Sequence, residues 1–153
     1  MTLSELLEDN LVLPRTACTS KDELISKLVE RIYNTRQDLP FHQEELLNVI
    51  NKRELIGGTL LPSGLSVPHA RLKDYDGFTV AIGIPGEPLL YEGNQIHMMT
   101  LMITSQSGGP YYLPVLAAFT KISKNREFFF RLCGAENFKD FINILREQDP
   151  VLN

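Results

Sequence analysis

Two stretches near the start of the chain carry apolar residues at helical spacing. The first begins after Ser20, with Glu23 three residues later as the partner of a capping box. Its apolar residues recur every three or four positions: Leu24, Ile25, Leu28, Val29, Ile32 and Tyr33. The second, "FHQEELLNVINKREL", follows Pro40 and is ended by the glycines at 57 and 58. The pattern predicts two helices, the second of which buries Leu46, Leu47 and Ile50.

The pattern changes to that of strands in the middle of the chain. In "FTVAIGIP", residues 78–85, large apolar residues alternate with small or polar ones up to a final proline. The stretch "HMMTLMIT", residues 97–104, is apolar at nearly every position, as expected of a strand whose two faces are both covered. We therefore expect two strands here.

Three further helical segments complete the chain: 111–123, then "REFFFRLC" ended by Gly134, then 136–148. Pro114 fits the first of them only within its opening turn. Helices first, strands in the middle and helices last predict an α/β fold, a layered domain with a mixed β-sheet flanked by α-helices. No repeat or low-complexity segment divides the chain, so we expect a single domain over residues 1–153.

Composition and charge exclude several classes of protein. The 153 residues are 43% hydrophobic and 22% charged, which is ordinary for a globular protein. The net charge of −4 and the absence of clustered Lys and Arg argue against a nucleic-acid partner. The start, "MTLSELLEDN", is acidic where a secretory signal is basic, and no run approaches 18 apolar residues. We expect a cytoplasmic protein with no direct membrane insertion.

The two cysteines, Cys18 and Cys133, show no CxxC spacing. We therefore expect both to be reduced and buried, with no disulfide framework and no zinc site. No motif in the chain calls for a metal or another cofactor.

The stretch "GLSVPHARL" contains the histidine of greatest interest, His69. By chemistry alone it can be a hydrogen-bonded structural ring, which is the commonest case, a metal ligand, or a nucleophile. A zinc site needs three or four ligands, and the three histidines of the chain lack the spacing of a known metal motif. As a nucleophile, His69 would follow a backbone stiffened by Pro68 at the point where the strand ends and the chain turns. Arg71 would then offset phosphoryl charge, or else be a solvated surface arginine.

Residues 51–72, "NKRELIGGTLLPSGLSVPHARL", carry a resemblance that favours the nucleophile. The segment resembles the signature of the fructose/mannitol-type enzyme IIA domains of the bacterial phosphoenolpyruvate-dependent sugar phosphotransferase system, including nitrogen-regulatory IIA proteins. That family commonly reads R-E, a small-residue segment, then G-I-A-[IV]-P-H-G. The matching positions here are Arg53-Glu54, Gly58-Thr59, Gly64 and Val67-Pro68-His69. The resemblance then extends over almost the whole chain.

The resemblance implies a function and two site residues. His69 would accept a phosphoryl group from a phosphocarrier protein and pass it on, in the transport members, to an enzyme IIB. Arg53 would be the arginine that lies beside the phosphohistidine; without the resemblance it reads as a solvated residue at a helix end. The alternative is a regulatory relative that binds a protein target and transfers phosphate slowly or not at all.

Two positions depart from the family pattern. Ala70 stands where the family usually has glycine, a minor change. Tyr112, in "YYLPVLAAF", stands where transport members usually have a second histidine. Its hydroxyl can donate a hydrogen bond but carries no positive charge, so we expect the site to hold phosphate weakly. Tyr112 can equally be an aromatic residue that packs near the start of a helix.

The remaining candidates have simpler interpretations. We read His42 and His97 as structural, and Asp74 and Asp76 as ordinary turn residues. Three leucines, at 60, 61 and 65, belong either to the core or to an apolar ring where a phosphocarrier docks. If His69 is the nucleophile, it should lie at a strand end, partly exposed, in one pocket with Arg53.

Overall fold

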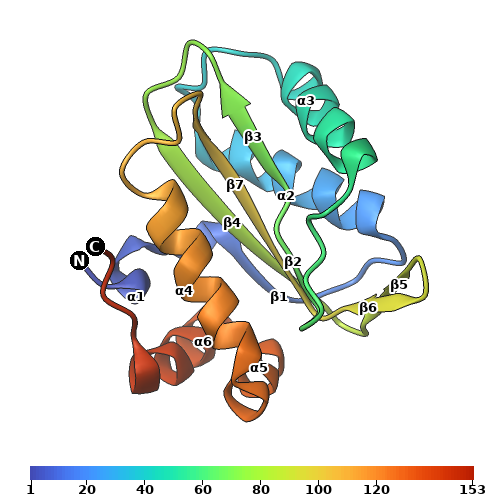
Figure 1. Ribbon diagram of the computed structural model, residues 1–153, viewed down its shortest axis with the longest axis vertical. Coiled ribbons are helices and arrows are strands. Elements are labelled where there is room, and N and C mark those ends of the chain that lie inside the picture. The colour runs from blue at the N-terminus through green and yellow to red at the C-terminus, as the bar shows by residue number, and fades with distance from the viewer.

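The computed structural model describes all of residues 1–153 and shows a mixed sheet between two layers of helices (Figure 1). In chain order its elements are α1 (Leu3–Leu6), β1 (Val12–Thr16), α2 (Lys21–Thr35), α3 (Gln43–Ile56), β2 (Leu65–Ser66), β3 (His69–Leu72), β4 (Phe78–Pro85), β5 (Leu89–Tyr91), β6 (Asn94–Ile96), β7 (Met98–Ser105), α4 (Tyr112–Lys124), α5 (Arg126–Cys133) and α6 (Phe138–Leu145). Short 3₁₀ turns at Asp9–Leu11 and Arg146–Gln148 complete the set. The predicted α/β class with a mixed sheet is confirmed.

The sheet has the strand order β1-β4-β7-β2, and β3 also pairs with β7. β4 and β7 are antiparallel, whereas β1 is parallel to β4, and β2 and β3 are parallel to β7. Leu65 pairs with Met98 and His69 pairs with Met102, so β2 and β3 lie one after the other along the same edge of β7. Val67 and Pro68 separate them.

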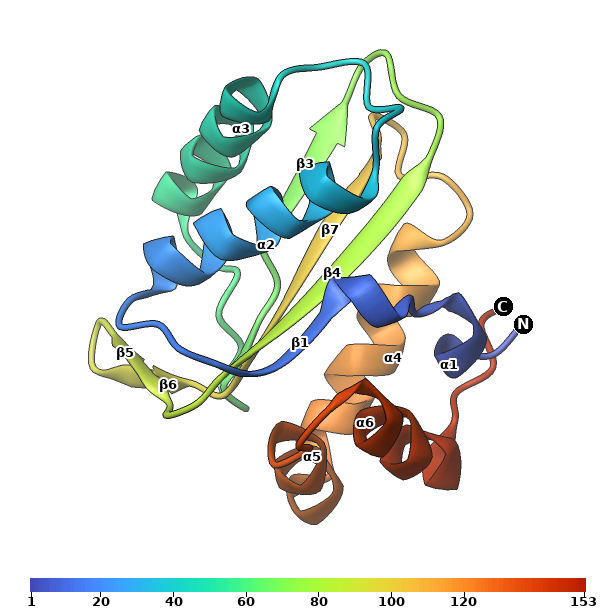
Figure 2. The same ribbon diagram turned by 180° about the vertical axis from the view of Figure 1, so that it is seen from behind.

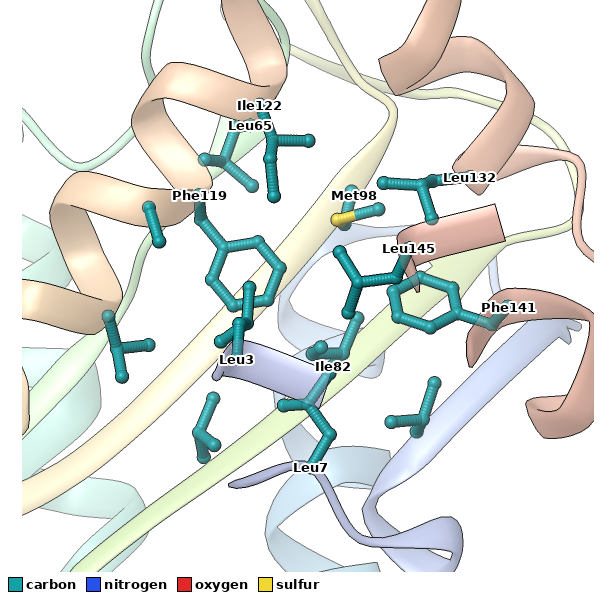
Figure 3. Close-up of a cluster of buried hydrophobic side chains, with 14 of the residues drawn as sticks. Leu3, Leu7, Leu65, Ile82, Met98, Phe119, Ile122, Leu132, Phe141 and Leu145 are labelled. Atoms are coloured by element: carbon teal, nitrogen blue, oxygen red, sulfur yellow. The ribbon is translucent and has the colours of Figure 1, made fainter. Parts of the chain in front are cut away.

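Helices cover both faces of the sheet. α2 and α3 lie on one face, and α4, α5, α6 and the short α1 lie on the other (Figures 1 and 2). Alternate residues of β7 therefore enter two cores: Met98 and Met102 face α4, while Met99 and Leu101 face α2 and α3. Figure 3 shows the first core, in which Phe119 of α4 packs with residues of the sheet and of α6. Burial on both faces explains the nearly unbroken apolar run of β7, as predicted.

Several helix boundaries lie where the sequence predicts them. The Ser20 hydroxyl accepts a hydrogen bond from the backbone N–H of Glu23 at 3.1 Å and caps α2. α3 ends at Gly57, which has φ +85°. Pro114 is the third residue of α4, within its opening turn. The last helix is shorter than predicted, because α6 ends at Leu145 and continues as a 3₁₀ turn.

Two features of the sheet differ from the sequence analysis. The prediction that the strand ends at His69 and the chain turns is wrong: β3 begins at His69 and continues to Leu72. The edge strand β1 was not predicted because Pro14 interrupts its pattern; Arg15 has φ +48° and the register with β4 shifts between Leu13 and Thr16. The β5–β6 hairpin was also missed, since each of its strands has only three residues.

Candidate functional site

His69 is the first residue of β3, and its half-buried side chain lies on the face of the sheet that α4 covers. Its Nδ1 lies 3.3 Å from the carbonyl oxygen of Val67, which belongs to neither β2 nor β3. A ring nitrogen bonded to a carbonyl must carry the proton, so this contact selects the Nδ1–H tautomer and leaves the lone pair on Nε2. The ring is held in one orientation with one nitrogen free to react.

Burial lowers the pKa of His69, and the positive charges of Arg53 and Arg71 lower it further. The Val67 carbonyl and the carboxylate of Glu54 act in the opposite direction, but the pKa stays below 6.5. The imidazole is therefore neutral at physiological pH, which is the form that has a lone pair to donate.

Arg53 comes from the last turn of α3 and is half-buried. Its Nη1 donates to the carbonyl oxygen of Gly57 at 2.8 Å, and it makes no ion pair within the chain. The guanidinium therefore keeps most of its donors free, close enough to His69 to affect the pKa of the imidazole. No hydrogen bond joins Arg53 to His69, so their sharing one site stays a prediction.

Tyr112 is the first residue of α4 and only 5% exposed. Its ring centroid lies 5.5 Å from that of His69, with the planes tilted by 52°. Arg71 lies over the ring of Tyr112, with its Cζ 4.8 Å from the ring centre. The fold thus places Tyr112 beside both His69 and Arg71, two residues singled out in the sequence. Arg53 is related to His69 through the effect of its charge on the pKa of the imidazole.

A buried ion pair that the sequence analysis missed holds the loop leading to this site. Glu54 accepts hydrogen bonds from Lys21 Nζ at 3.0 Å and from Thr59 Oγ1 at 2.6 Å. Both charged side chains are about 7% exposed. These bonds join the start of α2, the end of α3 and the 57–64 loop. Glu54 and Thr59 stand within the recognised motif, but nothing local in the sequence indicates Lys21 as their partner.

A wide groove of the molecule lies apart from His69. It has a volume of about 1350 Å³ and runs between the 57–64 loop and the β5–β6 hairpin, with Lys21, Ser66 and His97 among its lining residues. His69, Arg53 and Tyr112 do not line it. The site around His69 is therefore separate from this groove.

Exposed apolar side chains follow Arg53 and Tyr112 in the chain. Leu55 and Ile56, which follow Arg53 and Glu54 on α3, are 87% and 79% exposed, and Leu113, beside Tyr112, is 66% exposed. Of the leucines considered in the sequence, Leu65 is fully buried, so of its two alternatives the core is confirmed. Leu60 and Leu61 are half-buried and pack against the two cores.

The other histidines lie away from the site. His97 packs edge-on against Phe130, with 5.0 Å between ring centroids, and its ring occupies the space that a side chain at Gly64 would need. His42 is exposed at the start of α3 and forms no capping bond, so the structural interpretation of His42 is wrong. No three His, Cys, Asp or Glu side chains are close enough to hold a metal ion together.

The cysteines and the turn aspartates belong to no group of side chains that could hold a metal ion. Both cysteines are free thiols, and both are half-buried rather than fully buried. Burial raises the pKa of Cys133 to about 12, which keeps it a thiol. Asp74 and Asp76 lie exposed in the connection between β3 and β4. None of the helices is long and apolar enough to cross a membrane.

Comparison with known proteins gives relatives along nearly the whole chain. The chain is 24% identical to the PTS system 2-O-alpha-mannosyl-D-glycerate-specific EIIABC component of Escherichia coli (strain K12), over 97% of its own length and 23% of that protein's. It is 18% identical to a nitrogen regulatory protein of Bradyrhizobium diazoefficiens, over 95% of both.

Solved structures share the fold. The crystal structure of nitrogen regulatory protein IIA-Ntr from Neisseria meningitidis matches with a TM-score of 0.80 and 17% identity, over 94% of this chain and 98% of that one. The Escherichia coli enzyme IIAMTL, solved in complex with phosphorylated enzyme IIBMTL, matches with a TM-score of 0.72 and 14% identity, over 93% and 98% of the two chains. The model of one family, "Phosphoenolpyruvate-dependent sugar phosphotransferase system, EIIA 2", matches residues 5–148. The chain therefore belongs to this EIIA 2 family, whose domains accept phosphoryl groups and pass them on to EIIB.

Proposed function

We propose that His69 is the residue that accepts the phosphoryl group, and that Arg53 binds the phosphoryl oxygens. The observation that carries this proposal is the state of His69: a neutral imidazole whose Nδ1 is bonded to the Val67 carbonyl, beside a guanidinium with no carboxylate partner. A histidine with a purely structural role needs no arginine without an ion pair near it. A positive charge that is partly buried without an anion lowers the stability of the fold.

The transfer follows from this geometry. The Nε2 lone pair of His69 attacks phosphorus, a P–N bond forms, and the bond from phosphorus to the donor breaks with its electron pair leaving on the donor. The Nδ1 proton stays on the ring during attack, where the Val67 carbonyl stabilises the positive charge that develops. The free donors of Arg53 neutralise the phosphoryl oxygens through the loose transition state.

The donor in this proposal is a phosphocarrier protein in the cytoplasm, and the acceptor is an EIIB domain or a regulatory protein target. Leu55 and Ile56, which follow Arg53 closely in the chain, and Leu113, which follows Tyr112, are exposed apolar side chains. Such area suits a transient protein partner, because the charged centre can be covered without a deep pocket.

The direct test is phosphorylation with phosphoenolpyruvate, the first enzyme of the system and its phosphocarrier, followed by mass measurement. We expect one acid-labile phosphate, because protonation of the ring nitrogen weakens the P–N bond. His69→Ala should remove it without unfolding the domain, and His42→Ala, at an exposed histidine elsewhere, should leave it unchanged. A wild type that stays unphosphorylated by a cognate carrier contradicts the proposal.

Tyr112 favours a second candidate function, a regulatory module that binds a protein target and transfers phosphate slowly or not at all. The tyrosine lacks the charge of the histidine usual in transport members, and the match to a nitrogen regulatory protein covers 95% of both chains. Tyr112→His separates the two. Phosphorylation of this variant alone, with none of the wild type, supports the regulatory module.

A further inference from the structure

We propose that Arg71 is a second phosphoryl-binding residue and that the ring of Tyr112 is the support that holds it beside His69. The inference rests on the proposed function of His69. In this proposal Arg71, held against the ring of Tyr112, supplies the positive charge that the second histidine supplies in transport members.

Strand geometry places Arg71 on the correct side of the sheet. Residues two apart on a strand point to the same face, and His69 and Arg71 are both on β3. Their register is fixed by β7, where His69 pairs with Met102 and Arg71 with Thr104. Arg71 is exposed and His69 is half-buried, so a phosphoryl group arriving from solvent can reach both side chains.

One aromatic ring contacts both functional groups. The Arg71 Cζ lies 4.8 Å from the centre of the Tyr112 ring, and the His69 ring centroid lies 5.5 Å from the same centre. The buried tyrosine cannot turn freely, so it fixes where the guanidinium rests. This contact uses the face of the ring, whereas a role as hydrogen-bond donor would use the hydroxyl.

The loop after β7 closes over this pair. A Cβ built on Gly108 would lie 3.8 Å from Arg71 Nη1 and 3.8 Å from Tyr112 Cδ2, so the loop backbone packs against both side chains. Gly108 has φ +95°, and its carbonyl accepts a 2.7 Å hydrogen bond from Thr104 Oγ1. Thr104 also pairs with Arg71 of β3. One residue of β7 is therefore bonded both to the loop at Gly108 and to the strand that carries Arg71.

The charge of Arg71 is free to bind an anion. It makes no ion pair within the chain, and its contact with Tyr112 is with an aromatic ring rather than with a carboxylate. Glu54, the carboxylate that acts on His69, is occupied by Lys21 and Thr59. Arg53 from α3 and Arg71 from β3 therefore present two guanidiniums to one phosphoryl group. Unlike a second histidine, Arg71 keeps its charge across the physiological pH range.

The experiment compares two pairs of variants in the phosphorylation assay, with the lifetime of phospho-His69 and the rate of its formation as readouts. Arg71→Ala should lower one or both about tenfold, and Arg71→Lys, which keeps charge but not the planar fork, should lie between. Tyr112→Phe keeps the ring face and should resemble the wild type, whereas Tyr112→Leu should resemble Arg71→Ala. Lys73→Ala removes a nearby charge and serves as the matched control, with no change expected.

A second readout separates support from general stability. Removing Arg71 should raise the pKa of His69, measured by NMR titration, and Lys73→Ala should not. Tyr112→Leu made in the Arg71→Ala background should cause little further loss, because its effect acts through Arg71.

The outcomes are distinct. A wild type that is never phosphorylated overturns both proposals. A phosphorylated wild type with an unaffected Arg71→Ala variant overturns only the inference about Arg71, and a large loss in Tyr112→Phe would assign the role to the tyrosine hydroxyl instead.

Discussion

Two groups of charged side chains near the end of α3 differ in whether they form ion pairs. Lys21 and Glu54 are buried and bonded to each other, whereas Arg53 and Arg71 lie near His69 without a carboxylate partner. Arg53 and Glu54 are neighbours in the chain, yet one faces the site and the other faces the interior. The charges that hold the loop are neutralised inside the molecule, whereas the two arginines near His69 have no ion pair.

The largest effect should come from breaking the buried pair. Glu54→Gln leaves the Lys21 ammonium buried without its counter-ion, so we expect a loss of about 3–5 kcal/mol in the free energy of unfolding. Denaturant titration measures this loss. Lys21→Met combined with Glu54→Gln removes both charges and should recover part of it; an equal loss in the single and double variants would contradict the role assigned to the pair.

A smaller loss is expected at the glycine where α3 ends. Gly57 has φ +85° and ψ −176°, a region that is accessible almost only to glycine. Gly57→Ala should therefore cost about 1–3 kcal/mol and displace the carbonyl to which Arg53 donates. Gly86→Ala, at a glycine without a positive φ, is the matched control. Phosphorylation of His69 should slow only in the first variant.

Acid should weaken both the fold and the reaction through His69. Its pKa is lowered in the folded state, so the stability from keeping it neutral is present above the ordinary value of 6.5 and is lost as the pH falls through the folded pKa. His97, whose pKa burial also lowers, acts with the same sign. Thermal unfolding between pH 7.5 and 5 should show a shallower decline for His69→Ala than for the wild type. Parallel declines would place the titration elsewhere.

The smallest effect on stability should come from Arg53, which has no ion pair. Arg53→Ala removes one hydrogen bond to a loop carbonyl and no ion pair, so the free energy of unfolding should change by about 0.5 kcal/mol or less. The same variant should lose about 2–4 kcal/mol of transition-state stabilisation in phosphoryl transfer, measured as a rate. A large loss of stability instead would make Arg53 a structural residue.

Much of the fold is predictable because each layer has a strong local pattern. β4 and β7 lie within one residue of the predicted strands, and α2 begins at the predicted cap. The patterns fail where tertiary contacts decide. The start of β1 pairs with β4 despite Pro14, and a hairpin with three-residue strands has too few positions to show a period.

Residues within one motif of the site are predictable from the sequence, whereas contacts between distant segments are not. The motif around His69 and Arg53 is contiguous enough to indicate both residues, and Tyr112 follows from the family pattern. The contact between Arg71 and Tyr112 joins residues about 40 positions apart, through the pairing of β3 with β7 and the loop that follows. Lys21 and Glu54 meet through the packing of α2 on α3. No local pattern carries such pairs, because they depend on how the layers are placed.

The break at Pro68 also protects the molecule from aggregation. An edge strand offers free backbone N–H and C=O groups to any other extended chain, and a long flat edge can recruit copies of itself. Here one edge is divided into pieces of two and four residues, and the opposite edge has Pro14 and a register shift. Neither edge presents a long ladder for a second copy to extend. A protein that exposes leucine and isoleucine side chains on its helices thus offers no long sheet edge through which it could polymerise.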